Sequence, residues 1–311
     1  MNVTGWFQIG WSRDFPCGHL EPMRYFGIDL VAWRSENGTL CVVDAYCPHQ
    51  GAHLGYGGSV HGEAIRCPLH MMEWSLSGES VGGLCSNALR TWPTREVSGL
   101  IYLWHDADGG APWYEPEDIF KVFDDGLTEH DFTLECPGGT TLLSDVTIHP
   151  QRAAEDRVDR RHFAGTHSAR IPHFLDAEFL EDRFLVDFVV AFDEVTGEHT
   201  SGLQTVNLGL GVTYLRAWGR VEQRDVLAVT PVDGNVSNVF HTLWALRHPE
   251  VVEGALFTPE RYAEVSRREL HGDLKIWSRQ RFTPLGDDVR DDDKELALLR
   301  SWAERFYPRS W

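Results

Sequence analysis

The sequence has no long apolar run and few basic residues. No stretch approaches the roughly 20 apolar residues that a membrane-spanning helix needs, and residues 1–15 show no basic start followed by an apolar core, so we expect no signal peptide. The 28 Lys and Arg are outnumbered by 47 Asp and Glu, which gives a formal net charge of -19. Because contact with phosphates needs a basic face, this composition argues against a nucleic-acid partner. We therefore expect a cytoplasmic protein that binds neither membranes nor nucleic acids.

The sequence also lacks a glycine-rich dinucleotide motif and is poor in cysteine. No Gly-x-Gly-x-x-Gly stands between a strand pattern and a helix pattern, so we do not expect the chain to bind a nicotinamide cofactor itself. Only six cysteines occur in 311 residues. Four of them stand in apolar or strand-like surroundings, where we expect buried thiols rather than disulfides. These four are Cys17, Cys41, Cys85 and Cys136.

The other two cysteines belong to a motif that pairs each Cys with a His. It reads Cys-Pro-His from Cys47 to His49, then seventeen residues, then Cys-Pro-Leu-His from Cys67 to His70. Two thiolates and two imidazoles suit a [2Fe–2S] cluster whose cysteines hold one iron and whose histidines hold the other. A zinc site is the alternative, although zinc fingers usually place a Cys pair before a His pair.

This motif resembles that of the Rieske family, Cys-x-His, a spacer and Cys-x-x-His, and it matches at all four ligands. The resemblance implies that Cys47, His49, Cys67 and His70 bind a [2Fe–2S] cluster. The surrounding short strands and Gly-rich turns predict a small all-β domain, and a stretch rich in Asp, Gly and Pro at 106–116 predicts a linker. We assign residues 1–115 to this Rieske domain. Its predicted strands are at 6–9, 30–33, 40–43, 64–66 and 100–104, with a hairpin turn at Asn37-Gly38.

The rest of the chain, residues 116–311, reads as an α+β domain in which helices flank an antiparallel sheet. A helix over about 258–281 is predicted from Thr258 as cap and Pro259 at the first helical position. The predicted strands are at 131–136, 184–192, 206–218, 226–232 and 239–246, and further helices are predicted at 145–167, broken at Pro150, and at 291–305.

A second constellation of chemically active residues lies in this larger domain. A [2Fe–2S] cluster alone transfers single electrons, and a small electron-transfer protein that holds one needs only about a hundred residues. The pattern Asp-x-x-His-x-x-x-x-His is formed by Asp159, His162 and His167. Two imidazoles and one carboxylate make the facial triad of non-haem Fe(II) oxygenases, which leaves positions open for O2 and water.

Behind a Rieske motif, this pattern resembles the catalytic (alpha) subunit of Rieske non-haem iron oxygenases, nearest to the ketosteroid-hydroxylase-like branch. The resemblance implies a helix-grip-like catalytic domain with a mononuclear Fe(II) bound by His162, His167 and Asp273. Asp273 stands in a segment similar to the Asp-x-x-Ile-Trp of steroid-type members. A solvated helix carboxylate is the alternative interpretation of this residue.

The resemblance also gives Asp159 a catalytic role in electron transfer. In the family, the matching Asp accepts a hydrogen bond from an iron-bound His and another from a Rieske His of the neighbouring subunit, which here implies His162 and His70. Such a bridge implies a ring of subunits, most often a homotrimer. The chain departs from the family at Asp156, where Asn is common. The sequence leaves open whether Asp156 makes the iron pocket more anionic or is protonated.

The function expected from the resemblance is that of a terminal monooxygenase component. It would take electrons from NAD(P)H through a separate ferredoxin or flavin reductase and use O2 to hydroxylate a largely apolar small molecule. One alternative is dealkylation or desaturation by an enzyme of the same kind. The other is a Rieske electron-transfer protein whose second domain is inactive. The sequence names neither the substrate nor the oxidised carbon.

Overall fold

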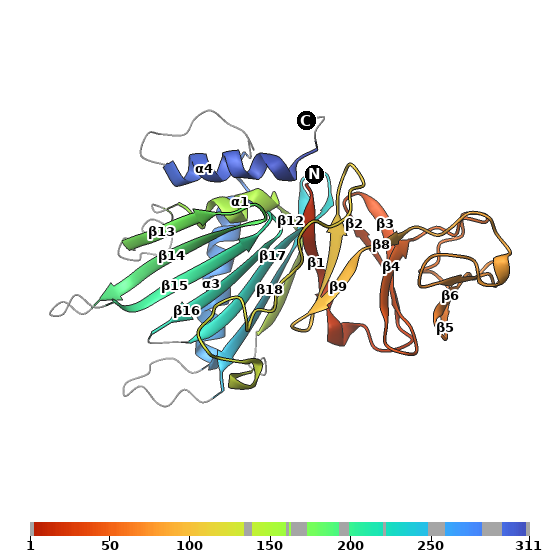
Figure 1. Ribbon diagram of the computed structural model, residues 1–311, viewed down its shortest axis with the longest axis horizontal. Coiled ribbons are helices and arrows are strands. Elements are labelled where there is room, and N and C mark those ends of the chain that lie inside the picture. Colours follow the sequence, from red (N-terminus) through yellow and green to blue (C-terminus); the bar gives the residue numbers. More distant parts are fainter. Residues whose placement is uncertain are drawn as a thin grey trace.

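The computed structural model describes residues 3–133, 139–159, 162, 173–192, 199–219, 222–247, 259–281 and 294–308. Within these ranges the chain forms two adjoining β lobes, a smaller one from the first third of the chain and a larger one from the rest (Figure 1). The predicted α+β class, with an all-β domain first and an antiparallel sheet with helices second, is confirmed. No helix in the described ranges is long and apolar enough to cross a membrane.

The first lobe is built from three small antiparallel sheets, with the strand orders β1-β10-β9, β2-β3-β4-β8 and β5-β6-β7. The strands predicted there are present, and the predicted Asn37-Gly38 turn joins β3 to β4 with a φ of 91° at Gly38, which glycine adopts readily. The bounds are β1 (Gly5–Trp11), β2 (Leu20–Tyr25), β3 (Ile28–Arg34), β4 (Leu40–Asp44), β5 (Ser59–His61), β6 (Ala64–Arg66), β7 (Glu73–Ser75), β8 (Thr91–Trp92), β9 (Thr94–Val97) and β10 (Leu100–His105).

The second lobe is one large antiparallel sheet with helices against it. Its strand order is β11-β18-β17-β16-β15-β14-β13, and β12 also pairs with β18. The long helix α3 packs against β12 and β18, while α4 packs against α1 and β13. The bounds are β11 (Phe132–Thr133), β12 (Thr140–Thr147), β13 (His173–Phe179), β14 (Arg183–Phe192), β15 (His199–Leu208), β16 (Val212–Trp218), β17 (Gln223–Asp233), β18 (Val236–Leu246), α1 (Pro150–Glu155), α3 (Pro259–Trp277) and α4 (Lys294–Ala303).

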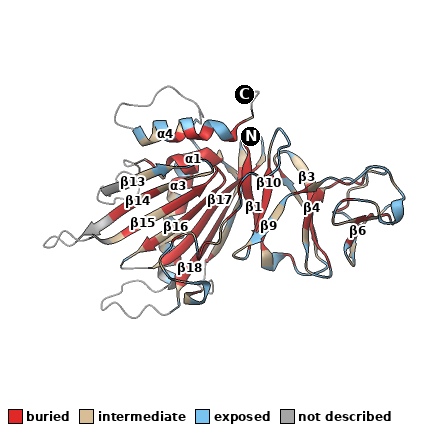
Figure 2. Cartoon of the chain, in the orientation of Figure 1, coloured by how far each residue is buried: buried red, intermediate tan, exposed pale blue. Residues whose placement is uncertain are grey.

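The two faces of the large sheet pack against different partners. Because side chains alternate along a strand, Val226 and Ala228 of β17 point into the apolar core shared with the first lobe. Leu227 and Val229 point the other way and pack with Leu270 of α3. Buried residues accordingly run along the central strands of both lobes (Figure 2). The α3-facing side of β17 and β18 is therefore a separate compartment from the core between the lobes.

The segment predicted as a linker, residues 106–116, is exposed over 107–111 and becomes buried at its end. Tyr114 lies in the shared core, and the indole N–H of Trp6 donates a hydrogen bond of 2.7 Å to the Tyr114 carbonyl. Across the lobes, the indole N–H of Trp11 donates to Thr242 Oγ1 at 2.8 Å. The chain around Tyr114 therefore packs in the core that the two lobes share.

The helix predicted over 145–167 is wrong in its first part. Residues up to Thr147 continue β12, which pairs with β18, and α1 covers only Pro150–Glu155. Pro150 occupies the first helical position, and His149 caps the helix by accepting a hydrogen bond from the Gln151 N–H at 3.2 Å. The cap at His149 and the proline after it therefore set the start of α1. The broad helical pattern of the sequence did not locate this start.

Other predicted elements differ mainly in their ends. The strand predicted at 206–218 is two strands, β15 and β16, separated by a turn at 209–211, and β13 was not predicted. The strand predicted at 131–136 is described only as β11, and the predicted starts of the last two helices, at 258 and 291–293, lie outside the described residues.

The cysteines outside the cluster motif are free thiols where the structure describes them, and their surroundings differ. Cys41 is buried and Cys85 is half-buried, but Cys17 is exposed, so its predicted burial is wrong. Cys17 lies in the loop before β2 rather than in a strand. Cys136 lies outside the described residues.

Candidate metal centres

Two loops of similar backbone shape carry the four residues of the Cys-His motif. One follows β4, and the other joins β6 to β7. In each loop a backbone N–H four residues after the Cys donates to the Cys carbonyl, from Gly51 to Cys47 at 2.8 Å and from Met71 to Cys67 at 3.1 Å. Gly51 has a φ of 74° and Met71 a φ of 58°. A non-glycine residue rarely adopts this left-handed conformation, so the second loop keeps its tight turn at a conformational cost.

These loops place the thiols inside and the imidazoles outside. Cys47 and Cys67 are each 2 % exposed and lie in a small apolar cluster with Trp74. His49 and His70 are exposed, and their ring centroids lie 4.9 Å apart. The structure therefore brings the four predicted cluster residues together at the tip of the first lobe.

The donor set and its burial fit an iron–sulfur cluster. Burial raises the pKa of the Cys47 thiol, so a thiolate there needs a nearby cationic centre, which an iron ion supplies. In a cluster of this type each iron takes two of the four ligands. Among the described residues no three His, Cys, Asp or Glu side chains are grouped closely enough to hold a single ion.

The second set of predicted residues meets between the end of α1 and helix α3. His162 Nε2 lies 3.3 Å from Asp273 Oδ1, and the two side chains are only 10 % and 7 % exposed. The backbone N–H of His162 donates to Asp159 Oδ1 at 3.1 Å. His167, the third predicted iron ligand, lies outside the described residues. The structure thus describes two of the three predicted ligands, and these two are in contact.

Helix α3 presents Asp273 on its buried face. Leu270, Leu274 and Trp277 of this helix pack in an apolar cluster against the sheet. Asp273 stands at the i+3 spacing that shares this face and is only 5 % exposed. A solvated helix carboxylate would not be buried to this degree, so that alternative interpretation does not fit.

Asp156 is the second carboxylate beside His162, and polar groups contact both of its oxygens. Asp156 Oδ2 lies 3.5 Å from His162 Nδ1 and accepts a hydrogen bond from the Trp277 indole N–H. Asp156 Oδ1 accepts a hydrogen bond of 2.7 Å from Arg152. The imidazole therefore stands between two carboxylates, with Nδ1 toward Asp156 and Nε2 toward Asp273. Arg152 is the basic side chain in contact with Asp156.

A buried ion-pair network holds α1 in place. Glu155 is fully buried and accepts hydrogen bonds from Arg152 Nη1 at 2.8 Å, Gln151 Nε2 at 3.1 Å and Arg300 Nε at 2.9 Å. Arg300 belongs to α4, so the network ties α4 to α1. Since α1 leads directly to Asp156, Asp159 and His162, this network fixes the segment that carries the site. Sequence reasoning gave Glu155 and Arg300 no role, because their proximity depends on the tertiary fold.

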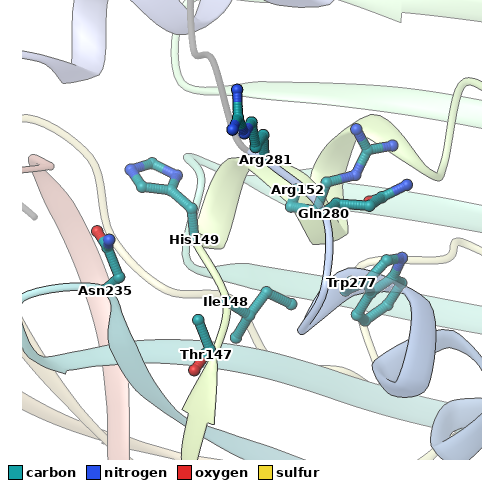
Figure 3. Close-up of a pocket in the computed structure, with 8 residues that line it drawn as sticks. All are labelled: Thr147, Ile148, His149, Arg152, Asn235, Trp277, Gln280 and Arg281. Carbon is teal, nitrogen blue, oxygen red and sulfur yellow. The ribbon is translucent and has the colours of Figure 1, made fainter.

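A pocket of about 400 Å³ opens beside the end of α3 (Figure 3). Trp277 and Arg152 both line this pocket and both donate hydrogen bonds to Asp156, so the pocket wall adjoins the carboxylate beside His162. Burial lowers the pKa of His149, in the same wall, to about 3, so that imidazole is neutral near pH 7. The lining residues are Thr147, Ile148, His149, Arg152, Asn235, Trp277, Gln280 and Arg281.

The two sites on this pair of lobes define a Rieske-type terminal oxygenase, and comparison with known families agrees. Residues 5–93 match the Rieske [2Fe-2S] domain, and residues 103–307 match the 3-Ketosteroid 9alpha-hydroxylase C-terminal domain. The chain belongs to this family of Rieske oxygenase components. It is an oxidoreductase of the monooxygenase type.

Relatives in the family include steroid-modifying enzymes. A cholesterol 7-desaturase of Bombyx mori is 26% identical over 98% of this chain and 69% of its own length. A probable 3-ketosteroid-9-alpha-monooxygenase oxygenase component of Rhodococcus rhodochrous is 33% identical over 55% of this chain and 43% of its own length. Among solved structures, Pseudomonas putida NdmA with caffeine has a TM-score of 0.70 at 14% identity, covering 96% of this chain and 89% of its own. Dicamba monooxygenase bound to dicamba has a TM-score of 0.62 at 13% identity, covering 97% and 96%. At these identities the structures support the fold alone.

Proposed function

We propose that this oxygenase carries two iron centres and uses them to hydroxylate a largely apolar small molecule. The proposed ligands are Cys47, His49, Cys67 and His70 for a [2Fe–2S] cluster, and His162, His167 and Asp273 for one Fe(II). The observation that carries the proposal is the buried contact of 3.3 Å between His162 Nε2 and Asp273 Oδ1. When bound, an Fe(II) held by two imidazoles and a carboxylate supplies open positions at which O2 is activated.

The residues around His162 prepare the site for this chemistry. Asp156 faces His162 Nδ1 and leaves Nε2 directed at Asp273. A carboxylate in this position orients a metal-binding imidazole and raises its basicity. Leu270 and Leu274, on the two sides of Asp273, pack in an apolar cluster. Apolar surroundings keep water away from reactive oxygen and favour a largely apolar substrate.

Electrons are proposed to pass between chains rather than within one. The loops that carry the cluster residues lie at one end of the long axis, beside β5 and β6, whereas α1 and α3 belong to the other lobe (Figure 1). His70 is exposed at this end. We propose a homotrimeric ring in which His70 of one chain meets Asp159 of the next, and Asp159 passes the electron toward His162. The electrons come from NAD(P)H through a separate ferredoxin or flavin reductase.

Desaturation is the second candidate function. It is favoured by two relatives that match nearly the whole chain. The cholesterol 7-desaturases of Bombyx mori and Ciona intestinalis each match 98% of it. Both reactions begin by removing hydrogen from an unactivated carbon, and they diverge at the second step, where that carbon either gains an oxygen atom or forms a double bond. The two proposed iron sites are the same for both reactions, so they do not decide between hydroxylation and desaturation.

The experiment that tests the function is a substrate screen with a surrogate reductase and NADH. Products are scored by mass, because hydroxylation adds one oxygen atom whereas desaturation removes two hydrogen atoms. Substrate-dependent O2 uptake together with about three iron atoms per chain supports the oxygenase. Iron near two per chain with no O2 uptake for any substrate would instead support an electron-transfer protein with an inactive second domain.

We also propose the division of the chain into a Rieske domain, residues 1–115, and a catalytic domain, residues 116–311. It is supported by the gap between the last strand of the first lobe, β10, and β11. A cytoplasmic location is proposed because NAD(P)H-linked reductases supply electrons in that compartment.

A further inference from the structure

Trp74 stands in the middle of β7, shortly after the loop that carries Cys67 and His70. It pairs with Ile65 of β6, so the two strands that flank this loop hold the residue in place. Its side chain is fully buried and packs in the small apolar cluster that also contains Cys47 and Cys67. The fold therefore places one indole ring in the same apolar surroundings as both thiols of the proposed [2Fe–2S] site.

The indole N–H of Trp74 has no nitrogen or oxygen acceptor among the described residues. An indole can only donate a hydrogen bond, and buried donors are nearly always paired in folded proteins. The group that receives this donor is the side chain of Cys47. Burial raises the pKa of the Cys47 thiol, and a hydrogen bond from Trp74 is among the contacts that oppose this rise. The buried N–H is therefore directed at a sulfur atom.

The strength of this hydrogen bond depends on the charge of the sulfur. A neutral thiol is a weak acceptor, whereas a hydrogen bond to an ionised group is roughly twice as strong as one between neutral groups. Trp74 therefore has a strong acceptor only when Cys47 is a thiolate. Bound iron keeps a coordinating thiol deprotonated, so the assembled cluster would supply the acceptor that this indole needs.

We propose that Trp74 donates its indole N–H to the Cys47 sulfur in the assembled cluster and thereby raises the reduction potential of the cluster. The inference rests on the proposed function, which assigns Cys47 to the cluster. Reduction adds one electron from the reductase and breaks no bond, and the sulfur atoms become more negative. The hydrogen bond from Trp74 therefore stabilises the reduced state more than the oxidised state. Trp74 acts through Cys47, so it is a residue that tunes the cluster and touches no substrate.

Trp33 provides a matched control in the same apolar cluster. It lies opposite Cys41 in the register of β3 and β4. It is fully buried, and its indole N–H also has no nitrogen or oxygen acceptor in the part of the chain that the structure describes. Burial raises the pKa of the Cys41 thiol to about 11, and a hydrogen bond from Trp33 opposes this rise. The two Trp–Cys pairs share their burial and chemistry, but Cys41 is not a proposed iron ligand.

The test is a redox titration of the whole reconstituted chain, followed by the visible absorption of the cluster. Trp74→Phe keeps an aromatic ring but removes the N–H. We expect the equilibrium constant for one-electron reduction to fall by about tenfold in this variant, which lowers the potential by about 59 mV. Trp33→Phe should leave the potential unchanged. An unchanged potential in Trp74→Phe, or equal shifts in the two variants, would overturn the proposal.

A second measurement detects the hydrogen bond itself in the wild-type protein. Protein with isotopically labelled indole nitrogens is reduced, and the hyperfine coupling of the cluster's unpaired electron to an indole nitrogen is recorded by pulsed electron paramagnetic resonance. The wild type and Trp33→Phe should show this coupling, and Trp74→Phe should lose it. A reduced wild-type cluster without the coupling would refute the hydrogen bond, whether or not the Phe variants fold.

A shape-preserving replacement separates the N–H from the packing of the ring. Site-specific exchange of the Trp74 indole for benzothiophene puts a ring sulfur in place of the N–H and keeps the size of the side chain. This protein should show the same lowered potential as Trp74→Phe. A wild-type potential after the exchange would mean that the effect of Trp74→Phe comes from packing, and it would contradict the proposal.

This proposal and the proposed function fail in distinguishable ways. If the wild type assembles its cluster and consumes O2 with a substrate, but Trp74→Phe keeps the wild-type potential, only the role of Trp74 is wrong. If the potential shifts as expected but no substrate supports O2 uptake, the proposed function fails and the role of Trp74 stands. A wild-type protein that assembles no [2Fe–2S] cluster refutes both.

Discussion

His162 Nε2 lies 3.3 Å from Asp273 Oδ1 in a buried setting, although one residue follows α1 and the other belongs to α3. On the opposite side of the same imidazole, Nδ1 faces Asp156, whose other oxygen accepts a hydrogen bond from Arg152. The chain thereby holds a histidine with both ring nitrogens directed at carboxylates. Such an arrangement suits a metal ligand on one side and an orienting partner on the other.

Replacing Asp273 should empty the second iron centre and leave the cluster in place. Asp273→Ala removes the carboxylate that faces His162, so iron per chain should fall from about three to about two, with the visible absorption of the cluster unchanged. Iron analysis and absorption spectroscopy measure this. Glu264→Gln, an exposed position on the same helix, is the control and should keep all the iron. Full iron content in Asp273→Ala would exclude Asp273 as a ligand.

Trp277→Phe should weaken iron binding at the second centre while it preserves the packing. The phenyl ring keeps most of the apolar contact but cannot donate to Asp156, so Asp156 holds His162 less firmly. Loss of such an orienting contact typically costs 10- to 100-fold in metal affinity, which an iron titration with a competing chelator measures. Trp302→Phe removes an indole N–H that donates to the Leu180 carbonyl. This control should leave the affinity for iron unchanged, and equal losses in both variants would show a general effect of packing.

Asp159→Asn should uncouple the two centres without emptying either. The amide keeps an oxygen that accepts the His162 backbone N–H, but it lacks the negative charge that suits a link between two imidazoles. We expect normal iron content, a normal cluster spectrum and nearly complete loss of product formation with the reductase present. Turnover at the wild-type rate in this variant would remove the bridging role.

Asp225 should make the stability of the protein depend on pH. Its folded pKa is raised to about 8 by burial, above the unfolded value of about 3.9. The folded state therefore holds a proton that the unfolded state has lost, and stability falls as pH rises through this window. His241, with a folded pKa lowered to about 4, acts in the opposite sense below about pH 6.5.

The pH effect is isolated by comparing the wild type with Asp225→Asn between pH 6.5 and 8. The difference in melting temperature should shift in favour of the variant as the pH rises, and it should level off above about pH 8. Thermal unfolding followed by circular dichroism provides the measurement. A difference that stays constant across the range would mean that Asp225 is ionised in the folded protein.

The parts of the site that could be predicted from sequence are those whose residues lie close together in the chain. The Cys-His arms are complete within 47–49 and 67–70, so their chemistry is visible without a fold. Asp273 was assigned only through a resemblance, because its contact with His162 depends on how α3 packs on the sheet. The burial of Gln223 and Asp225 was not predicted, since polar residues at alternate positions are typical of a solvent-facing strand. That face of the sheet is buried only because helix α3 covers it.

The same limit applies to the fold. In the first lobe, strand-like runs and a strong turn signal predicted β1, β3, β4, β6 and β10, whereas the other strands, β2, β5, β7, β8 and β9, were not predicted. Residues 145–147 were predicted as helix but belong to β12, because β12 depends on pairing with β18, a partner distant in sequence. The local sequence around β12 contains no information about β18, but it does contain Pro150, the proline that begins α1.

The central claim is that each chain holds a histidine-coordinated iron–sulfur cluster, which collects electrons, and a separate iron, which receives them from the cluster of a neighbouring chain. The most direct test is electron paramagnetic resonance of the dithionite-reduced, anaerobically reconstituted protein, combined with iron analysis. The account predicts the signal of a reduced [2Fe–2S] centre with two imidazole ligands and about three iron atoms per chain. A protein with no such signal, or with zinc bound by Cys47 and Cys67, would contradict it.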